Sequence, residues 1–245
     1  MKIAINQSYF FPYIGYFQLI DSVDKFIIYD YVTFRKKSWI TRNKILDKGT
    51  NSPLNINVPV IGKSSNKLIR EVHIYDDIKW KKKLLNMLFY NYKKAPFFNE
   101  VYPFFERIIA LKENNLHYYN SYVITEICKL LEIDTQITYD NSLNKDVELG
   151  LINKSNNKLN IKTERIIRLC NKYNKTIYVN SIGGTKIYDK NIFNKRGIDL
   201  LFIKMKNVTY SQSNDSFVPN LSIVDMLMYI GVNQTKEKIK EYYFI

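Results

Sequence analysis

Side chains able to bind a ligand are densest near the start of the chain. The apolar alternation of residues 2–6 predicts a short buried strand, which runs into a polar and aromatic loop at Gln7 before helical spacing resumes at Tyr13. A second apolar run, residues 26–29, ends in a carboxylate, Asp30. Open α/β sheets bind ligands at the carboxyl ends of their strands, because helix N-termini and unpaired backbone N–H groups converge there. We therefore expect the floor of a site at these two strand ends.

Cations, amides and large rings surround these two strand ends in the sequence. The further candidate binding residues here are Tyr9, Tyr13, Lys37, Trp39, Arg42 and Asn43. Aromatic clusters belong to the core more often than to a site, whereas amides and arginines at strand ends favour ligand contacts or a buried hydrogen-bond network. The sequence leaves both explanations open for the polar residues.

A second group of candidate binding residues follows a predicted strand at 176–180. Gly183 and Gly184 form a tight loop after this strand, and Tyr188 follows the loop. Paired glycines after a strand allow backbone N–H groups to approach a phosphate or a carboxylate closely. A turn that needs positive φ explains the two glycines equally well.

Length and composition favour one domain spanning residues 1–245. A chain of 245 residues can bury a full core, and no linker divides it. A βαβ pattern in the second half predicts an α/β fold, with a mixed, partly parallel sheet, flanking helices and a helical insertion at about 76–132. No apolar run is long enough to cross a bilayer and no secretory signal is visible, so we expect a cytoplasmic protein without a membrane span.

The charge of the chain favours an anionic partner. A formal net charge of +14 suits a nucleotide, a coenzyme, an acidic carrier protein or RNA. Lys, Asn, Ile and Tyr are abundant while Gly and Pro are scarce, which is typical of an AT-rich genome, so part of the lysine excess reflects composition. The charge therefore supports phosphate in the ligand without identifying the ligand.

Metal and thiol chemistry are not expected. Cys128 and Cys170 each lie in an apolar helical pattern without a neighbouring His or Cys, so we interpret them as core thiols. Zinc needs four ligands at characteristic spacing, and the chain adds only His73 and His117. A histidine in a strand, such as His73, is more often a half-buried structural residue than a catalytic one. A catalytic Cys–His pair is a minor alternative. The sequence identifies no cofactor.

The remaining elements follow from periodicity and from turn residues. The further expected strands are 42–46, 54–60, 69–74, 136–139 and 200–203. The expected helices begin at 76, 104, 118, 163 and 221, and Gly231 ends the last of them. The basic stretch 61–67 predicts a mobile flap, and the polar stretch 140–159 predicts a mobile connection or a lid.

Several of these motifs together resemble one family. The stretches QSYFFPYIGYFQLI, DKFIIYDYVTF, SWITRNKI, YKKAPFF, SIGGTKIYD and LSIVDMLMYIG occur in the order found in WbqC-like proteins, over nearly the whole chain. The resemblance implies a role in the biosynthesis of bacterial O-antigens, capsules or other surface glycans. The matching positions are Gln7, Tyr9, Phe11, Pro12, Tyr13, Gly15, Tyr16, Asp30, Trp39, Arg42, Asn43, Gly183, Gly184, Tyr188, Ser222 and Asp225.

The chain departs from the family pattern at three places. Ser8 replaces the usual proline, Tyr31 replaces a second aspartate, and Leu84 stands where a histidine often follows the tryptophan and lysines. Because of this last difference, we carry over no catalytic histidine.

The reaction that the resemblance implies is transfer of an acyl or aminoacyl group to an amino sugar carried on a nucleotide. Such a transfer needs a base for the proton of the amine and donors for a tetrahedral oxyanion. Asp30 is the candidate base. Gln7, Asn43 or the backbone amides of Gly183 and Gly184 are the candidate oxyanion donors.

The other candidate residues would bind the substrate. Lys37 and Arg42 would hold phosphate, while Trp39 and Tyr9 would stack on a base or a sugar ring. The acyl donor is left open between coenzyme A, a carrier protein and aminoacyl-tRNA. The alternative is a non-enzymatic module that binds a glycan intermediate or RNA.

Overall fold

A six-stranded sheet forms the centre of the fold in the computed structural model, which describes all residues except 63, 65, 76, 140–142, 153–157 and 213–215. Its strand order is β10-β9-β8-β1-β2-β7. The strands are β1 (Lys2–Asn6), β2 (Lys25–Ile28), β7 (Gln136–Thr138), β8 (Ile177–Ser181), β9 (Asp199–Met205) and β10 (Tyr242–Phe244). Neighbouring strands are parallel except for β10, which pairs antiparallel with β9. The predicted α/β fold with a mixed, partly parallel sheet is therefore confirmed.

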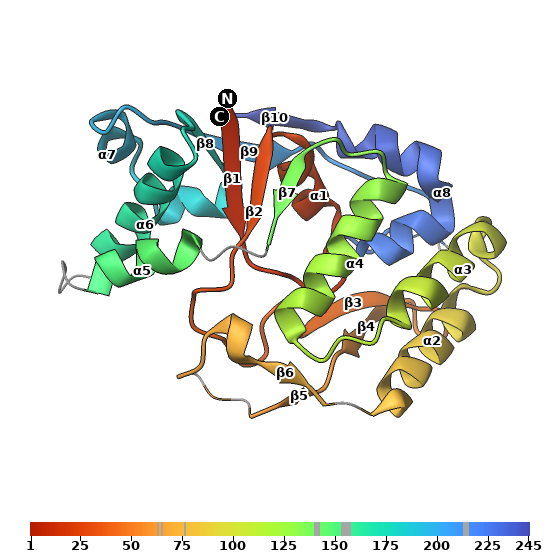
Figure 1. The fold of residues 1–245 in the computed structure, drawn as a ribbon. Helices are drawn as coiled ribbons and strands as arrows, with labels where there is room; N and C mark the ends of the chain where they lie inside the picture. The colour runs from red at the N-terminus through yellow and green to blue at the C-terminus, as the bar shows by residue number, and fades with distance from the viewer. Residues whose placement is uncertain (63, 65, 76, 140–142, 153–157, 213–215) are drawn as a thin grey trace.

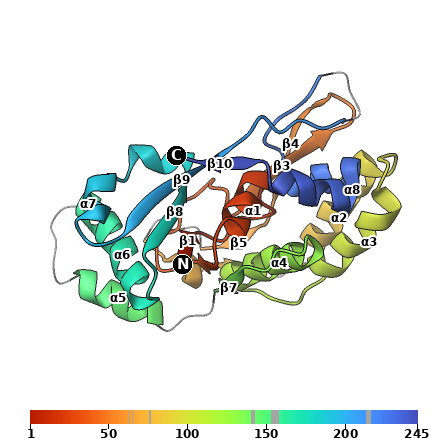
Figure 2. The same cartoon turned by 90° about the horizontal axis from the view of Figure 1, so that it is seen from above.

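Helices cover both faces of this sheet (Figure 2). One layer contains α1 (Ile14–Asp21), α4 (Leu116–Leu130) and α8 (Ile223–Ile239), and the other contains α5 (Leu143–Ile152), α6 (Lys158–Lys172) and α7 (Lys190–Asn194). Ala4 and Phe26 point into the first layer, while Ile3 and Ile27 point into the second. Because side chains alternate along a strand, the continuous apolar runs of β1 and β2 supply both cores.

The segment between β2 and α4 lies beyond the carboxyl ends of the parallel strands (Figure 1). It contains β3 (Arg42–Asp47), β4 (Ser52–Asn57), β5 (Val60–Ile61), β6 (His73–Ile74), α2 (Ile78–Tyr92) and α3 (Phe98–Ile109). β3 pairs antiparallel with β4, and β5 pairs antiparallel with β6. Because this segment covers the edge where α/β sheets bind ligands, its side chains can meet those that follow β1 and β2.

Two expected elements of this segment are wrong. Residues 69–74 are not one strand, because η1 (Ile69–Glu71) is a 3₁₀ helix and only the two residues of β6 are extended. The Glu71 carboxylate accepts a hydrogen bond from the Leu68 backbone N–H at 2.7 Å, which closes this turn. The helix expected from residue 104 begins at Phe98 instead and contains Pro103. Pro103 has no backbone N–H, so the helix loses one internal hydrogen bond. Burial of the apolar face of the helix compensates for this loss.

The described residues of the polar stretch 140–159 are helical. α5 occupies ten of them, and α6 begins at Lys158 instead of residue 163. Val147 and Leu151 lie one helical turn apart and are buried against the sheet, so two apolar positions are enough to fix α5. The two ends of the predicted connection, 140–142 and 153–157, lie outside the described residues.

Gly231 ends the first helical part of α8, as the sequence predicts, and a second helical part follows across a kink. The φ of Gly231 is +71°, and helical structure resumes beyond it as far as Ile239. A Cβ at this position would lie 2.5 Å from a ring carbon of Phe97, so the bend brings α8 against the residue that precedes α3. A glycine is needed here because other residues rarely adopt positive φ and because no side chain fits.

Both cysteines are core thiols, as the sequence predicts. Cys128 and Cys170 are buried, and burial raises the pKa of the Cys170 thiol to about 12. Among the described residues, no group of three or more His, Cys, Asp or Glu side chains could hold a metal ion. None of the described helices combines the length and the apolarity needed to cross a membrane.

Candidate functional site

Asp30 follows β2 and is the buried carboxylate of the carboxyl edge, with only 4% of the residue exposed. Arg70 Nε, from η1, lies 3.9 Å from Asp30 Oδ2, and His117 Nε2, from the first turn of α4, lies 3.7 Å from the same oxygen. A buried carboxylate is costly unless groups that bear N–H donors compensate it. We call Asp30, Arg70 and His117 the Asp30 cluster.

His117 is fully buried, and its two ring nitrogens have different partners. Nε2 lies 2.9 Å from the Tyr139 carbonyl oxygen, while Nδ1 lies 3.4 Å from Ser8 Oγ. Because a carbonyl oxygen only accepts hydrogen bonds, Nε2 carries a proton and donates to Tyr139, while Nδ1 pairs with the Ser8 hydroxyl. His117 thus links the residues that follow β1, β2 and β7.

Arg70 is the partly exposed member of the cluster, with 32% of its side chain accessible. Its guanidinium carbon lies 4.1 Å from the centroid of the Tyr31 ring, a cation–π contact that fixes the plane of the guanidinium. The Arg70 backbone is also anchored, because its N–H donates to the Asp30 carbonyl and its carbonyl accepts from the Asn115 side chain at 2.8 Å. An anionic ligand arriving from solvent therefore meets an oriented arginine.

The strand order reverses at β1, which lies between β2 and β8. Doubly wound sheets bind ligands at such a reversal, where connections leave toward opposite faces. Gln7 follows β1, and η2 (Ile182–Lys186) follows β8 directly, so the structure brings Gln7 and the glycine loop to neighbouring strand ends. The Gln7 carbonyl accepts a hydrogen bond from the Tyr16 hydroxyl at 2.7 Å. The Gln7 side chain makes no hydrogen bond with the part of the chain that the structure describes.

The glycine loop is not a positive-φ turn. Neither Gly183 nor Gly184 has positive φ, so that explanation is wrong. A Cβ on Gly184 would lie 2.6 Å from Asn180 Oδ1 and 3.1 Å from the Phe202 ring, so close packing requires this glycine. Nothing lies within 4 Å of a Cβ built on Gly183, which is exposed. Its backbone is therefore open to a ligand.

A polar group lies on the opposite face of the sheet from α4. The Tyr29 hydroxyl donates to Glu148 Oε1 at 2.5 Å, and Arg165 donates two hydrogen bonds to the same carboxylate. Burial and the neighbouring Glu148 raise the pKa of the Tyr29 phenol above its ordinary value. Tyr188 packs against Tyr178 in this layer, and burial raises the pKa of Tyr188. The structure thus separates Tyr188 from the α4 side of the sheet.

The two candidate tyrosines of the first loop pack around α1. The Tyr9 ring centroid lies 5.4 Å from that of Tyr16, and Tyr13 forms the N-cap of α1 and a backbone bridge with Ser222. Burial raises the pKa of both Tyr9 and Tyr13. Each keeps part of its surface exposed, and a ligand-binding role stays a prediction.

The remaining candidates lie between β2 and β4. Lys37 and Trp39 are exposed in the loop, and 44% of Trp39 is accessible. Arg42 begins β3 and is half-buried. The buried Asn43 amide donates to the carbonyls of residues 10 and 11 at 3.1 and 2.7 Å, so its observed bonds fix the loop after β1. The Trp39 carbonyl also accepts a hydrogen bond from the Phe10 N–H of that loop at 2.8 Å, and none of these four residues belongs to the Asp30 cluster.

Sequence reasoning misses the two partners of Asp30. The sequence pattern predicts a strand around Arg70, and it considers His117 only as a zinc ligand. Asn115 is the sequence feature that could have pointed to His117. The Asn115 side chain accepts hydrogen bonds from the backbone N–H groups of residues 117 and 118 and so caps α4. A capped helix start places His117 at a helix N-terminus, where α/β proteins bind ligands. Arg70 has no comparable local signal.

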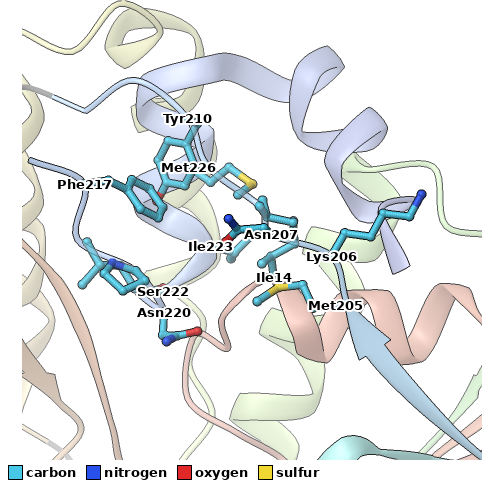
Figure 3. A pocket seen from close by; sticks show the side chains of 13 residues that line it. Ile14, Met205, Lys206, Asn207, Tyr210, Phe217, Asn220, Ser222, Ile223 and Met226 are labelled. Carbon is cyan, nitrogen blue, oxygen red and sulfur yellow. The ribbon is translucent and has the colours of Figure 1, made fainter. Parts of the chain in front are cut away.

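A cavity of about 320 Å³ lies at the carboxyl end of β9, next to the start of α8 (Figure 3). Its apolar lining includes Ile14, Met205, Phe217 and Met226. Figure 3 shows the Lys206 side chain extending away from the other labelled groups. The lining mixes apolar and polar side chains, and it contains no carboxylate or imidazole and none of the predicted site residues.

Asp225 is a second buried carboxylate, and protein groups surround it. It accepts hydrogen bonds from the hydroxyls of Tyr92 and Tyr210, both at 2.7 Å, and from Gln212 Nε2 at 2.8 Å. The Tyr92 hydroxyl also accepts from the Leu46 backbone N–H at 3.0 Å. Burial raises the pKa of Asp225. This network ties α2, β3, α8 and the loop after β9 together, which indicates a structural role.

Comparisons with known proteins cover nearly the whole chain. Residues 7–237 match the WbqC-like protein family. An uncharacterised protein of Mycobacterium tuberculosis (strain ATCC 25618 / H37Rv), Rv1507c, is 32% identical over 232 residues, which cover 94% of this chain and 94% of that protein. No solved structure matches the chain. The match spans every residue of the Asp30 cluster and the glycine loop, and the chain belongs to the WbqC-like protein family.

Proposed function

We propose that this protein is a cytoplasmic transferase of bacterial surface-polysaccharide biosynthesis, which moves an acyl or aminoacyl group onto the amine of a nucleotide-linked amino sugar. The Asp30 cluster carries the proposal, because it sets a carboxylate between an imidazole and a guanidinium at the ligand-binding edge of the sheet. Membership of the WbqC-like family supports the link to surface glycans.

The reaction assigns one proton transfer to Asp30. The sugar amine attacks the acyl carbonyl carbon, an N–C bond forms, and the bond to the donor's leaving group breaks as the tetrahedral intermediate collapses. Asp30 accepts the amine proton and returns it to the leaving group. His117 is fully buried and would act as a positioning residue, since its Nε2 lies beside Asp30 Oδ2 while the ring is held from Tyr139 and Ser8.

Two groups at the strand reversal can stabilise the oxyanion. The Gln7 side chain is uncommitted within the described chain, and the Gly183 backbone is open on the side where a Cβ would lie. Both are better suited to this role than Asn43, whose amide donates to backbone carbonyls.

Cations and rings near the edge would hold the nucleotide. Arg70 is oriented and partly exposed, and it joins Arg42 and Lys37 as a phosphate ligand. Trp39 is exposed enough to stack on the nucleobase. The net charge of +14 would draw the anionic substrate toward the protein.

The reaction itself tests the proposal. Purified protein is incubated with nucleotide-linked amino sugars and, in turn, with acyl-coenzyme A, acyl carrier protein and aminoacyl-tRNA, and the N-acylated product is measured by mass spectrometry. Asp30→Asn should lower turnover at least about 100-fold, a typical loss for a general base. Asp134→Asn, at an exposed position, is the matched control and should keep full turnover. Wild-type turnover in Asp30→Asn would refute the assignment.

Substrate binding is measured separately from turnover. A nucleotide sugar that binds only the folded state raises the melting temperature by mass action. Arg70→Ala and Arg42→Ala should each reduce this shift, whereas Asp30→Asn should retain it. The proposal is wrong if no nucleotide sugar stabilises the protein and none is modified with any of the three donors.

A further inference from the structure

We propose that the outer face of α2 binds single-stranded RNA. Residues at helical spacing along α2 and its C-terminal end form one continuous exposed stripe, which we call the α2 face. Its members are Lys79, Lys82, Lys83, Asn86, Phe89, Tyr90, Lys93 and Lys94. The α2 face spans about 22 Å at 1.5 Å per residue. The proposal concerns binding alone and does not depend on the transfer reaction.

The α2 face is cationic throughout. It carries five lysines and no carboxylate. Lys79 lies 3.9 Å from Asp77, whereas Lys82, Lys83 and Lys94 form no ion pair with any described residue. An uncompensated row of cations of this length attracts a polyanion, because each cation that meets a phosphate releases a condensed counterion.

Two aromatic rings lie among these cations. Tyr90 is 65% exposed, while Phe89 is 40% exposed and also packs edge-on against Phe98 and Tyr102 of α3. The Lys93 ammonium lies 5.5 Å from the Phe89 ring centroid and 5.6 Å from that of Tyr90. Aromatic rings interleaved with cations are the surface on which unpaired bases stack while the backbone follows the charges.

Two features of the α2 face favour RNA over an anionic membrane or an acidic protein as its partner. The apolar face of α2, with Leu84, Leu88 and Tyr92, is buried inside the protein, so the exposed side of α2 lacks the broad apolar face of a membrane-surface helix. Lysine is depleted at protein–protein interfaces, which weighs against an acidic protein. Figure 1 shows α2 at the edge of the molecule beside α3, away from the sheet, so a long strand could lie along it.

Fluorescence anisotropy with a labelled single-stranded RNA of about 20 nucleotides tests the proposal. Lys82→Glu/Lys93→Glu should weaken binding at least about 10-fold and lower the slope of log Kd against log salt concentration by about 1.4, the value for two lost phosphate contacts. Tyr90→Ala should weaken binding roughly 5- to 100-fold while the salt slope stays unchanged, because stacking releases no counterions.

The control variant is Lys145→Glu/Lys195→Glu, which makes the same charge change at exposed positions of α5 and the end of α7. It should bind RNA within about 2-fold of wild type. Equal losses in the control and the α2 variant would assign binding to net charge and overturn the proposal. Circular dichroism establishes that each variant is folded.

Two further ligands separate the possible sources of affinity. Duplex DNA of the same length should bind more weakly than the single strand and should be insensitive to Tyr90→Ala, because its bases are already stacked. Binding to vesicles of anionic phospholipid that depends on the α2 lysines, in the absence of RNA binding, would identify a membrane surface and refute the proposal.

Discussion

Removing the ring nitrogens of His117 should destabilise the protein strongly. The His117→Phe variant leaves the Tyr139 carbonyl, 2.9 Å from Nε2, and the Ser8 hydroxyl, 3.4 Å from Nδ1, without the imidazole. It also removes the N–H group beside the Asp30 carboxylate. A buried polar group left unpaired costs about 1–3 kcal/mol. Because the Ser8 contact is long, we expect a total loss of about 2–5 kcal/mol in the free energy of unfolding.

The assay is urea unfolding followed by tryptophan fluorescence and circular dichroism, with linear extrapolation to water. The only other histidine supplies a matched control, because His73 is exposed in β6 and His73→Phe should change stability by less than about 0.5 kcal/mol. His117→Gln retains a side-chain N–H donor and should recover part of the loss. If His117→Phe costs no more than His73→Phe, the imidazole does not support the carboxylate and the reasoning fails.

Two further predictions concern the fold. Gly231→Ala should lower the free energy of unfolding in urea by about 2–4 kcal/mol, because φ is +71° and a Cβ would lie 2.5 Å from Phe97. Gly197→Ala, at φ +72° with open space around the Cβ, should lower it by only about 1–2 kcal/mol. Equal losses would show that the ring contact contributes nothing. Burial raises the pKa of Asp225, so the stability linked to its proton is complete below about pH 3.9 and is lost as the pH rises through the folded-state value. The stability of wild type relative to Asp225→Asn should therefore fall as the pH rises above about 4, and a flat or rising difference would contradict the assignment.

Patterns within a few residues were enough to predict five of the six strands of the central sheet, and only β10 was missed. The apolar runs of β1, β2, β7, β8 and β9 are continuous or alternating and end at turn or polar residues, so both the strands and their partly parallel arrangement could be inferred. Local patterns failed where stability came from elsewhere. α5 lies in a stretch of the chain that is rich in Asn and Lys, and it forms because Val147 and Leu151 meet the sheet, while η1 forms because Glu71 caps it.

The sequence alone determined that Gln7 and Asp30 each follow the end of a strand, because strand ends can be read from local periodicity, and the structure pairs these two strands. Only the tertiary structure decided that Arg70 and His117 complete the cluster around Asp30, since they come from separate elements that meet by packing. The tertiary structure also shows why a glycine is needed at position 184: a side chain there would collide with Asn180, whereas the backbone has no positive φ. Local sequence fixes backbone periodicity and the types of side chain that end each strand, but the contacts among distant segments depend on how their apolar faces pack together.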